Sequence, residues 1–375
     1  MKKSILGSTA LVAVGALASA PAQAEGWEAS IGGYMNTYFS VGGIDESSTA
    51  TEDYNSTGLF SDGEIHFNFA MTTDNGLQFG ARVELEAAGE ANNFGDEVDE
   101  RFIFVEGSFG RVVAGSTNTA AYQMHYAAPY AGLPINSGWV TVFIPVNYAD
   151  FTTAFEHPGL STYIDIGGDN NSISYYTPRF SGFQLGLTYV PSANMNGDGK
   201  NFPVEADTET EYHNGFSVGV NYVEDFNGFG VAVSGGWRYA QMPDSLSGVP
   251  GADDYGAYSV GAQLSYAGFT VGGSYANEYS GVTDGTISTE GEGWDAGVSY
   301  AIGPWTFAAT YFQGEISGDI VDVSTDQMQA AQVGLNYAIG PGISVGAGVM
   351  WGEYESENGA DQSGIVGAAG LTFSF

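Results

Sequence analysis

The chain has no cysteine and very few basic residues. Its 375 residues include 8 Lys and Arg against 44 Asp and Glu. Without cysteine, no disulfide can hold the fold together, so hydrogen bonds and packing must do so. The shortage of bases excludes nucleic acid as a partner, because binding to phosphates requires a basic surface. The acidic balance instead favours divalent cations and cationic solutes.

Long apolar runs are missing after residue 24. Residues 1–24 contain Lys2-Lys3, an apolar stretch and Ala22-Gln23-Ala24, which is the pattern of a secretory signal peptide and its cleavage site. Beyond it, no segment approaches the roughly 20 apolar residues of a membrane helix. We therefore expect residues 25–375 to form a β domain, either a soluble sandwich or a closed barrel in a membrane.

The sequence is rich in period-two alternation of apolar and polar residues, the pattern of half-buried strands. Residues 77–86 place Arg82, Glu84 and Glu86 on one face. Three charges do not fit a dry core, but they can face a wide aqueous lumen or the outside of a sandwich. Sixteen segments alternate in this way: 27–41, 64–72, 77–86, 99–107, 111–116, 172–179, 183–191, 213–223, 229–239, 255–266, 269–279, 294–301, 305–316, 328–337, 343–354 and 364–375.

The connections between these segments decide between the two folds. Tight turns such as Asn227-Gly228 alternate with long acidic connections at 44–57, 193–211, 243–254, 280–293, 318–326 and 355–363. An even number of strands with one tight-turn end and one long-loop end is typical of bacterial outer-membrane barrels. The sequence therefore predicts an all-β protein, a 16-stranded antiparallel transmembrane β-barrel in the outer membrane of a Gram-negative bacterium.

One connection, residues 117–171, is far longer than the others and contains many aromatic residues and prolines. A connection of this length is usually functional. Its apolar side chains need burial, which the wall of a barrel offers. We expect this loop to fold inward and narrow the lumen. The alternative is an external loop that covers the barrel mouth or a neighbouring subunit.

Two blocks give a specific resemblance. RFIFVEGSFGRVVAGSTNTAAYQMHYAAPY (residues 101–130) and NSISYYTPRFSGFQLGLTYVPS (residues 171–192) resemble the trimeric general diffusion porins of alphaproteobacteria. The resemblance implies 16 strands, a homotrimer in contact with outer-membrane lipid and lipopolysaccharide, and an eyelet in which acids of the inward loop oppose bases of the wall. The terminal GLTFSF resembles the signal read by the barrel-assembly machinery. The Pro-Glu-Phe-Gly-Gly run of many such loops is absent here.

Candidate eyelet residues follow from the alternation and from the loop. On the wall they are Arg82, Glu84 and Arg238, the last flanked by outward-facing Trp237 and Tyr239. Each of these could instead be a structural charge. The acids of the loop are Asp150, Glu156, Asp165 and Asp169. Because carboxylates outnumber bases so strongly, we expect the lumen to prefer cations.

Metal and catalytic motifs are weak. Asn194, Asn196, Asp198 and Glu205 have the spacing of an EF-hand loop, but Asn holds the first position and Pro203 interrupts the following helix. We expect no required cofactor, with Ca²⁺ at the acidic loops as an option. The four histidines show no metal-binding spacing, and we expect no enzymatic activity.

The sequence thus predicts a pore for passive diffusion of small hydrophilic solutes and ions. Two alternatives stay open, a substrate-selective channel and a plugged barrel with an adhesive role.

Overall fold

The computed structural model describes residues 26–45, 54–88, 98–136, 139–145, 159–164, 169–192, 212–247, 253–283, 286–318, 324–356 and 361–375, and the statements below concern these residues. The predicted signal peptide, residues 1–24, lies outside them, so its removal stays a prediction.

Sixteen strands make up almost all of this structure, as predicted. The strands are β1 Glu28–Asp45, β2 Thr57–Thr72, β3 Gln78–Ala88, β4 Arg101–Gly107, β5 Gly110–Ser116, β6 Asn171–Tyr176, β7 Phe183–Ser192, β8 His213–Phe226, β9 Phe229–Gln241, β10 Tyr255–Tyr266, β11 Phe269–Thr283, β12 Thr286–Ile302, β13 Trp305–Gly318, β14 Ser324–Gly340, β15 Ile343–Ser356 and β16 Asp361–Ser374. Three short helices complete the elements: α1 Ala120–Gln123, α2 Val140–Phe143 and the 3-10 turn η1 Asp244–Leu246. None of the helices in the described ranges is long and apolar enough to cross a membrane.

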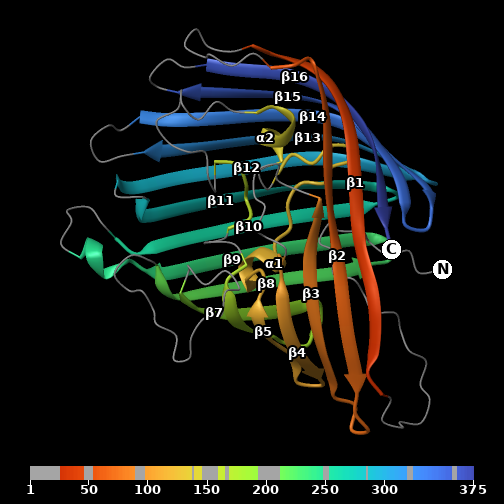
Figure 1. The fold of residues 1–375 in the computed structure, drawn as a ribbon, viewed down its shortest axis with the longest axis vertical. Helices are drawn as coiled ribbons and strands as arrows, with labels where there is room; N and C mark the ends of the chain where they lie inside the picture. Colours follow the sequence, from red (N-terminus) through yellow and green to blue (C-terminus); the bar gives the residue numbers. More distant parts are fainter. Residues whose placement is uncertain are drawn as a thin grey trace.

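The strands form a closed barrel in which each pairs antiparallel with its neighbours in sequence (Figure 1). The ring closes where β1 pairs with β16, with Phe39 opposite Ala369. Gly33 and Phe375 exchange two backbone hydrogen bonds of 3.1 Å at this seam. Closure removes the unpaired edges that a membrane could not satisfy.

Tight turns connect the strands at one end, as the sequence indicates. Asn227 and Gly228 both have positive φ, 58° and 92°, which matches the twist of the flanking strands. The predicted long connection 280–293 is wrong in its extent, since β11 continues to Thr283 and β12 begins at Thr286. The sequence of residues 280–289 does not alternate regularly between apolar and polar residues, and such alternation is the signal on which the prediction depends.

The two faces of the barrel differ in chemistry. The predicted apolar face of β1 is the exterior, where Ile31 is 64 % and Phe39 54 % exposed. Val333 on β14 and Ile103 on β4 continue this exterior at 66 % and 63 %. The interior carries many polar and small residues, together with an apolar patch that includes Phe312, Met328 and Met350.

The connection from β5 to β6 folds into this interior, as predicted. Figure 1 shows its helices α1 and α2 against the ring of strands. Helix α1 contacts β7, β8 and β9. The segment around α2 packs on Tyr38 of β1 and Tyr354 of β15. The loop therefore crosses most of the circumference of the inner wall.

Candidate functional site: the inner loop and the charged wall

The loop is fastened where it leaves the wall. One carboxylate oxygen of Glu100, Oε1, accepts hydrogen bonds from Thr117 Oγ1 at 2.9 Å, Asn118 N at 3.1 Å and Asn118 Nδ2 at 3.0 Å. At the other root of the loop, Ser116 Oγ donates to the backbone carbonyl of Asp169. Both roots are thus held to the same corner of the barrel, beside β4 and β5.

Inward-facing glycines form the seat on which the loop lies, chiefly its outgoing leg (residues 117–136). A Cβ added to Gly261 on β10 would lie 1.8 Å from the carbonyl oxygen of Tyr126, and one on Gly219 of β8 would lie 2.4 Å from that of Ala120. No side chain tolerates contacts this short, so loop backbone and strand backbone touch directly. The same holds for Gly334 below Ala131, Gly297 below Pro129 and Gly314 below Gly159.

Polar wall side chains satisfy the loop backbone beside these glycines. Ser217 Oγ accepts from Ala121 N and Ser234 Oγ from Tyr126 N, each at 2.9 Å. Thr310 Oγ1 donates to the carbonyl of Pro129 at 2.7 Å. Further contacts of this kind are Thr188 to Ala120 N, Gln263 to Ala127 O, Asn336 to Gly132 N and Tyr354 to Ile144 O. An irregular buried segment requires such partners, because unpaired backbone groups are costly.

A buried polar network joins the outgoing leg of the loop (residues 117–136) and its returning leg (residues 159–164) to the wall. Asn136 Nδ2 donates to Thr162 Oγ1 at 2.7 Å and to Asp295 Oδ2 at 2.5 Å. Ser274 Oγ donates to Asp295 Oδ1 at 2.8 Å, which fixes the Thr162 hydroxyl as the donor to Ser274 Oγ at 2.6 Å. His125 Nε2 then donates to Thr162 Oγ1 at 3.2 Å.

Protonation would disrupt this arrangement. His125 is 3 % exposed, and its Nδ1 has no hydrogen-bond partner among the described residues. Burial lowers the pKa of His125 to about 3, because a charged imidazole would lose its hydration. The network therefore uses a neutral histidine.

The apolar part of the loop packs at the far side of the lumen. Leu133, Val140 and Ile144 are fully buried against Phe312 and Met350 of the wall. Trp139 meets Phe60 of β2 edge-on, with ring centroids 5.5 Å apart. This burial explains why the loop is rich in aromatic and aliphatic residues.

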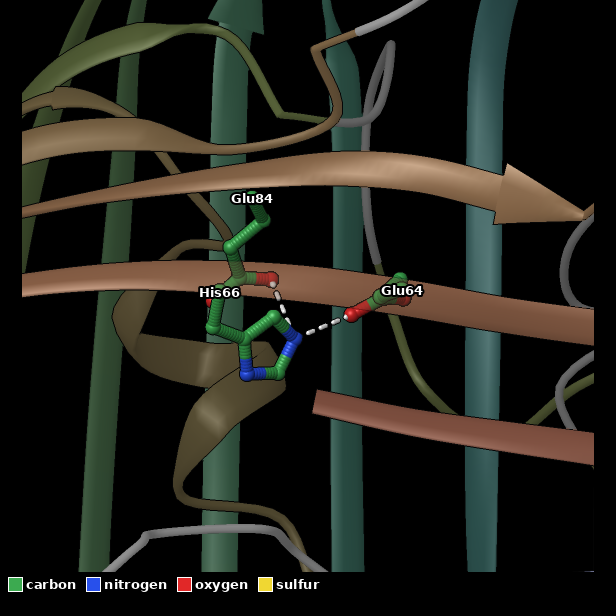
Figure 2. Close-up of side chains that lie close together, drawn as sticks. All are labelled: Glu64, His66 and Glu84. Atoms are coloured by element: carbon green, nitrogen blue, oxygen red, sulfur yellow. Dashed lines mark hydrogen bonds and ion pairs between the residues drawn. The ribbon is translucent and has the colours of Figure 1, made fainter. Parts of the chain in front are cut away.

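The inner face of β2 and β3 is built differently, from charged side chains. Arg82 Nε lies 2.6 Å from Glu84 Oε1, and Arg82 Nη2 lies 2.5 Å from His66 Nδ1. His66 Nε2 lies 2.7 Å from Glu64 Oε2 and 3.7 Å from Glu84 Oε2. Figure 2 shows both carboxylates beside the ring of His66. Tyr34 donates to the other oxygen of Glu64 at 3.0 Å. We call Glu64, His66, Arg82 and Glu84 the charged wall cluster.

The hydrogen bonds of the cluster assign the tautomer of His66. A guanidinium can only donate, so Nδ1 must accept, and the ring proton of the neutral imidazole sits on Nε2, facing Glu64. Register creates the cluster: Glu64 and His66 are two residues apart on β2, and His66 lies directly opposite Glu84 on β3. The spacing of the histidines alone could not show this, because the partners lie on different strands.

The predicted eyelet residues are placed as follows. Arg82 and Glu84 belong to the charged wall cluster. Arg238 is 3 % exposed, under the returning leg, with Nη1 3.5 Å from the carbonyl of Ile164, so it does not face open lumen. Asp169 lies at the loop root, where burial, then Glu100 and Asp99, hold the pKa of its carboxyl well above the ordinary value.

The remaining candidates lie outside the described residues. These are Asp150, Glu156 and Asp165 of the loop and Asn194, Asn196, Asp198 and Glu205 of the EF-hand-like segment. Sequence reasoning missed Glu64 and His66, and also the glycine seat. Glycines at inward positions of alternating strands were the available signal for the seat.

A closed barrel with an apolar exterior and an inner loop is the architecture of porins, and comparisons with known proteins agree. Three solved structures share the fold. A porin refined at 1.8 Å is 16 % identical, with 93 % of this chain and 100 % of that chain covered and a TM-score of 0.56. An anion-selective porin from Comamonas acidovorans is 14 % identical, with 93 % and 100 % of the two chains covered and a TM-score of 0.59, and OmpT of Vibrio cholerae is 14 % identical, with 95 % and 100 % covered and a TM-score of 0.57.

The chain matches the Gram-negative porin family over residues 7–358 and belongs to it. It is thus an outer-membrane protein with a transmembrane β-barrel. An uncharacterized protein of Rickettsia bellii is 25 % identical over 299 residues, which span 64 % of this chain and 66 % of that protein.

Proposed function

We propose that this porin is a water-filled pore for passive diffusion of small hydrophilic solutes. The observation that carries the proposal is the unequal lining of the inner wall. The loop backbone lies on the glycine seat of β8–β14, and its apolar segment around α2 reaches Tyr38 and Phe60 of β1 and β2. The charged wall cluster lies on β2 and β3, where its ion pairs join side chains of these two strands. A loop docked along the wall in this way narrows a lumen without filling it, and the charged side chains of β2 and β3 supply a polar lining.

Liposome swelling with sugars of graded size tests the pore. Swelling that declines smoothly with sugar size supports diffusion through an aqueous lumen. Swelling with one sugar and not with others of equal size favours a substrate-selective channel. The absence of conductance steps in a planar bilayer, together with no swelling, favours a plugged surface-binding barrel.

Cation preference is the second part of the proposal. Glu64, Glu84 and Glu86 share the inner face of β2 and β3 with one arginine, Arg82, and one histidine, His66. A lining rich in carboxylates raises the local concentration of cations. One structural relative is an anion-selective porin, so the shared fold does not set the sign of selectivity. The reversal potential across a KCl gradient measures it, and a potential of anion-selective sign would overturn this part.

Assembly into a trimer is the third part. Two rows of aromatic contacts cover the exterior of β7–β14, including Tyr189 with Phe216 and Trp305 with Tyr337. Such rows normally mark contact with the membrane interfaces. The exterior of β4–β6 instead presents aliphatic residues such as Ile103 and Ile173. This contrast supports subunit contacts on the β4–β6 side and lipid contact on β7–β14.

Single cysteines test the subunit contact cleanly, because the chain has none of its own. We expect Ile103→Cys to crosslink between subunits and Val333→Cys on β14 to remain uncrosslinked. Equal crosslinking at both positions would contradict the assignment. Contacts with lipopolysaccharide, recognition by the assembly machinery and Ca²⁺ at the acidic loops remain proposals from the sequence.

A further inference from the structure

The charged wall cluster has the geometry of a metal site with one nitrogen and two oxygen ligands. His66 Nε2 lies 2.7 Å from Glu64 Oε2 and 3.7 Å from Glu84 Oε2. Ligands about 2.0–2.1 Å from a tetrahedral Zn²⁺ are about 3.3 Å apart, between these two values. Small rotations of the carboxylates would therefore close the three atoms around one ion. Figure 2 shows the carboxylates of Glu64 and Glu84 both directed at the same ring nitrogen of His66.

The backbone already orders the three ligands. Glu64 and His66 share the inner face of β2, and His66 stands opposite Glu84 across a paired register. Strands of a closed barrel hold side chains more firmly than a loop would. The cost of gathering the ligands is therefore low.

One ligand is buried and incompletely used. Glu84 is 7 % exposed, and Arg82 Nε engages its Oε1. Its Oε2 points at His66 Nε2 from 3.7 Å, which is too far for a hydrogen bond. Among the described residues, this long contact with His66 is the one polar contact of Glu84 Oε2. The atom is thus aimed at the position that a shared cation would occupy.

The donor set selects the kind of metal. Imidazole nitrogen suits Zn²⁺, Cu²⁺ and Ni²⁺, whereas Ca²⁺ and Mg²⁺ prefer oxygen ligands alone. Glu86 and Asp99 lie beside Glu64 in a second group of carboxylates, with ligand atoms within 4.8 Å of one another. These neighbours add negative charge that favours a divalent ion over a monovalent one.

Arg82 opposes the ion. Its Nη2 donates to His66 Nδ1 and so keeps the proton on Nε2, the atom that a metal would need. Binding requires the ring proton to move from Nε2 to Nδ1 and the guanidinium to leave Nδ1, while its Nε keeps Glu84 Oε1. Arg82 is thus a competitor that limits affinity.

We propose that Glu64, His66 and Glu84 bind a borderline-soft divalent cation such as Zn²⁺, and that the bound ion reduces cation flow past this wall. The second half rests on the proposed pore function, whereas the first half does not. The ion replaces an imidazole proton that shifts to Nδ1, so no oxidant or reductant is involved.

The binding half is tested on untagged, detergent-solubilised protein with Cu²⁺ alone as the probe. We expect an electron paramagnetic resonance spectrum with nitrogen coupling from one imidazole, lost in His66→Asn and retained in His213→Asn, the matched control on β8. Because such sites bind Cu²⁺ more tightly than Zn²⁺, a large excess of Zn²⁺ should displace the Cu²⁺ signal, and the same excess of Ca²⁺ should not. A spectrum unchanged by His66→Asn, or equal displacement by Ca²⁺, overturns the site.

If Arg82 competes with the metal ion, its removal should strengthen metal binding, a result that a misfolded variant would not produce. Removing a unit positive charge this close to the ion should tighten Zn²⁺ binding by at least about tenfold in Arg82→Gln. Weaker or unchanged binding in that variant contradicts the role of Arg82.

The pore half is tested in planar bilayers. Zn²⁺ should lower single-channel conductance in KCl for the wild type and not for Glu64→Gln or His66→Asn. If Cu²⁺ binds through His66 while Zn²⁺ leaves the conductance unchanged, the metal site stands and its regulatory role is wrong. If the protein shows no conductance at all, the proposed pore function is wrong, and the spectroscopic experiment still decides whether the metal site exists.

Discussion

The two sides of the inner wall hold their groups by opposite means. On β8–β14, glycines without side chains let the loop backbone touch the strands, as Gly261 does at the carbonyl oxygen of Tyr126. Neutral hydroxyl and amide groups beside them bind the loop backbone, as Ser234 does at Tyr126 N. On β2 and β3, long charged side chains bind one another, as Arg82 and Glu84 do. The first side fixes a shape, because a backbone contact tolerates no added atom. The second side fixes a charge, because ion pairs can rearrange without displacing the chain.

The buried network should be the most sensitive point of the loop side. Asp295 accepts hydrogen bonds from Ala128 N, Asn136 Nδ2 and Ser274 Oγ. Asp295→Ala leaves these three donors without their partner, at roughly 1–3 kcal/mol each. We expect the loop to detach and become sensitive to protease, with larger and noisier conductance steps.

The control for this variant is Asp225→Asn, at a tight turn between β8 and β9. It removes a charge far from the loop and should leave the protease pattern unchanged. Equal protection of the loop in wild type and Asp295→Ala would show that the network does not hold it.

Acid should loosen the loop through His125. The folded-state pKa of about 3 lies below the ordinary 6.5, so unfolded chains bind more protons between these values. The stabilising contribution is therefore complete above pH 6.5 and is lost as pH falls toward 3. At pH 4.5 the loss amounts to about 2–3 kcal/mol.

Thermal unfolding measured against pH checks this sign. His125→Gln cannot take up the proton, so the difference in Tm between variant and wild type should shift in favour of the variant as pH falls from 7 to 4.5. A difference that stays constant with pH would contradict the assignment to His125.

The glycine seat should respond to a single methyl group. Gly261→Ala places a Cβ against the carbonyl oxygen of Tyr126 and should cost roughly 1–3 kcal/mol of loop docking. Swelling rates for larger sugars should rise. Gly367→Ala on β16 is the matched control, because its nearest neighbour would lie 3.8 Å from the new Cβ. Similar swelling in the two variants would argue against the seat.

The charged side should respond least in structure and most in selectivity. Glu86→Gln removes an exposed carboxylate opposite Glu64 and should lower the cation preference by less than about twofold, since one exposed charge is screened by salt. Glu28→Gln, at the start of β1, serves as the control. A reversal potential that shifts equally in both variants would show that the carboxylates of β2 and β3 do not set the ion selectivity.

The strands and the inward loop were predictable from the sequence, because both depend on local patterns. Alternation in residues 27–41 fixes the faces of β1, and turn residues such as Asn227-Gly228 fix where hairpins end. The aromatic content of residues 117–171 required burial, which favoured the lumen wall over the alternative of a loop covering the barrel mouth or a neighbouring subunit.

The site was predictable only in part, since it depends on register between strands. Glu84 could be assigned to the inner face from its own strand, but its meeting with His66 needs the pairing of β2 with β3. Arg238 shows the opposite failure. It faces inward as predicted, yet the returning leg of the loop covers it at Ile164. Alternation along a strand tells which face a residue occupies but not where a loop passes over that face.

The fastening of the loop also dictates an order of events. Gly132 N bonds to Asn336, 204 residues away, and Ala128 N bonds to Asp295, 167 residues away. These anchor points come together only after the strands from β6 to β14 have paired, so we expect docking of the loop to be a late step in maturation. A newly inserted barrel should therefore pass through a wide-bore, leaky intermediate before it reaches its working diameter.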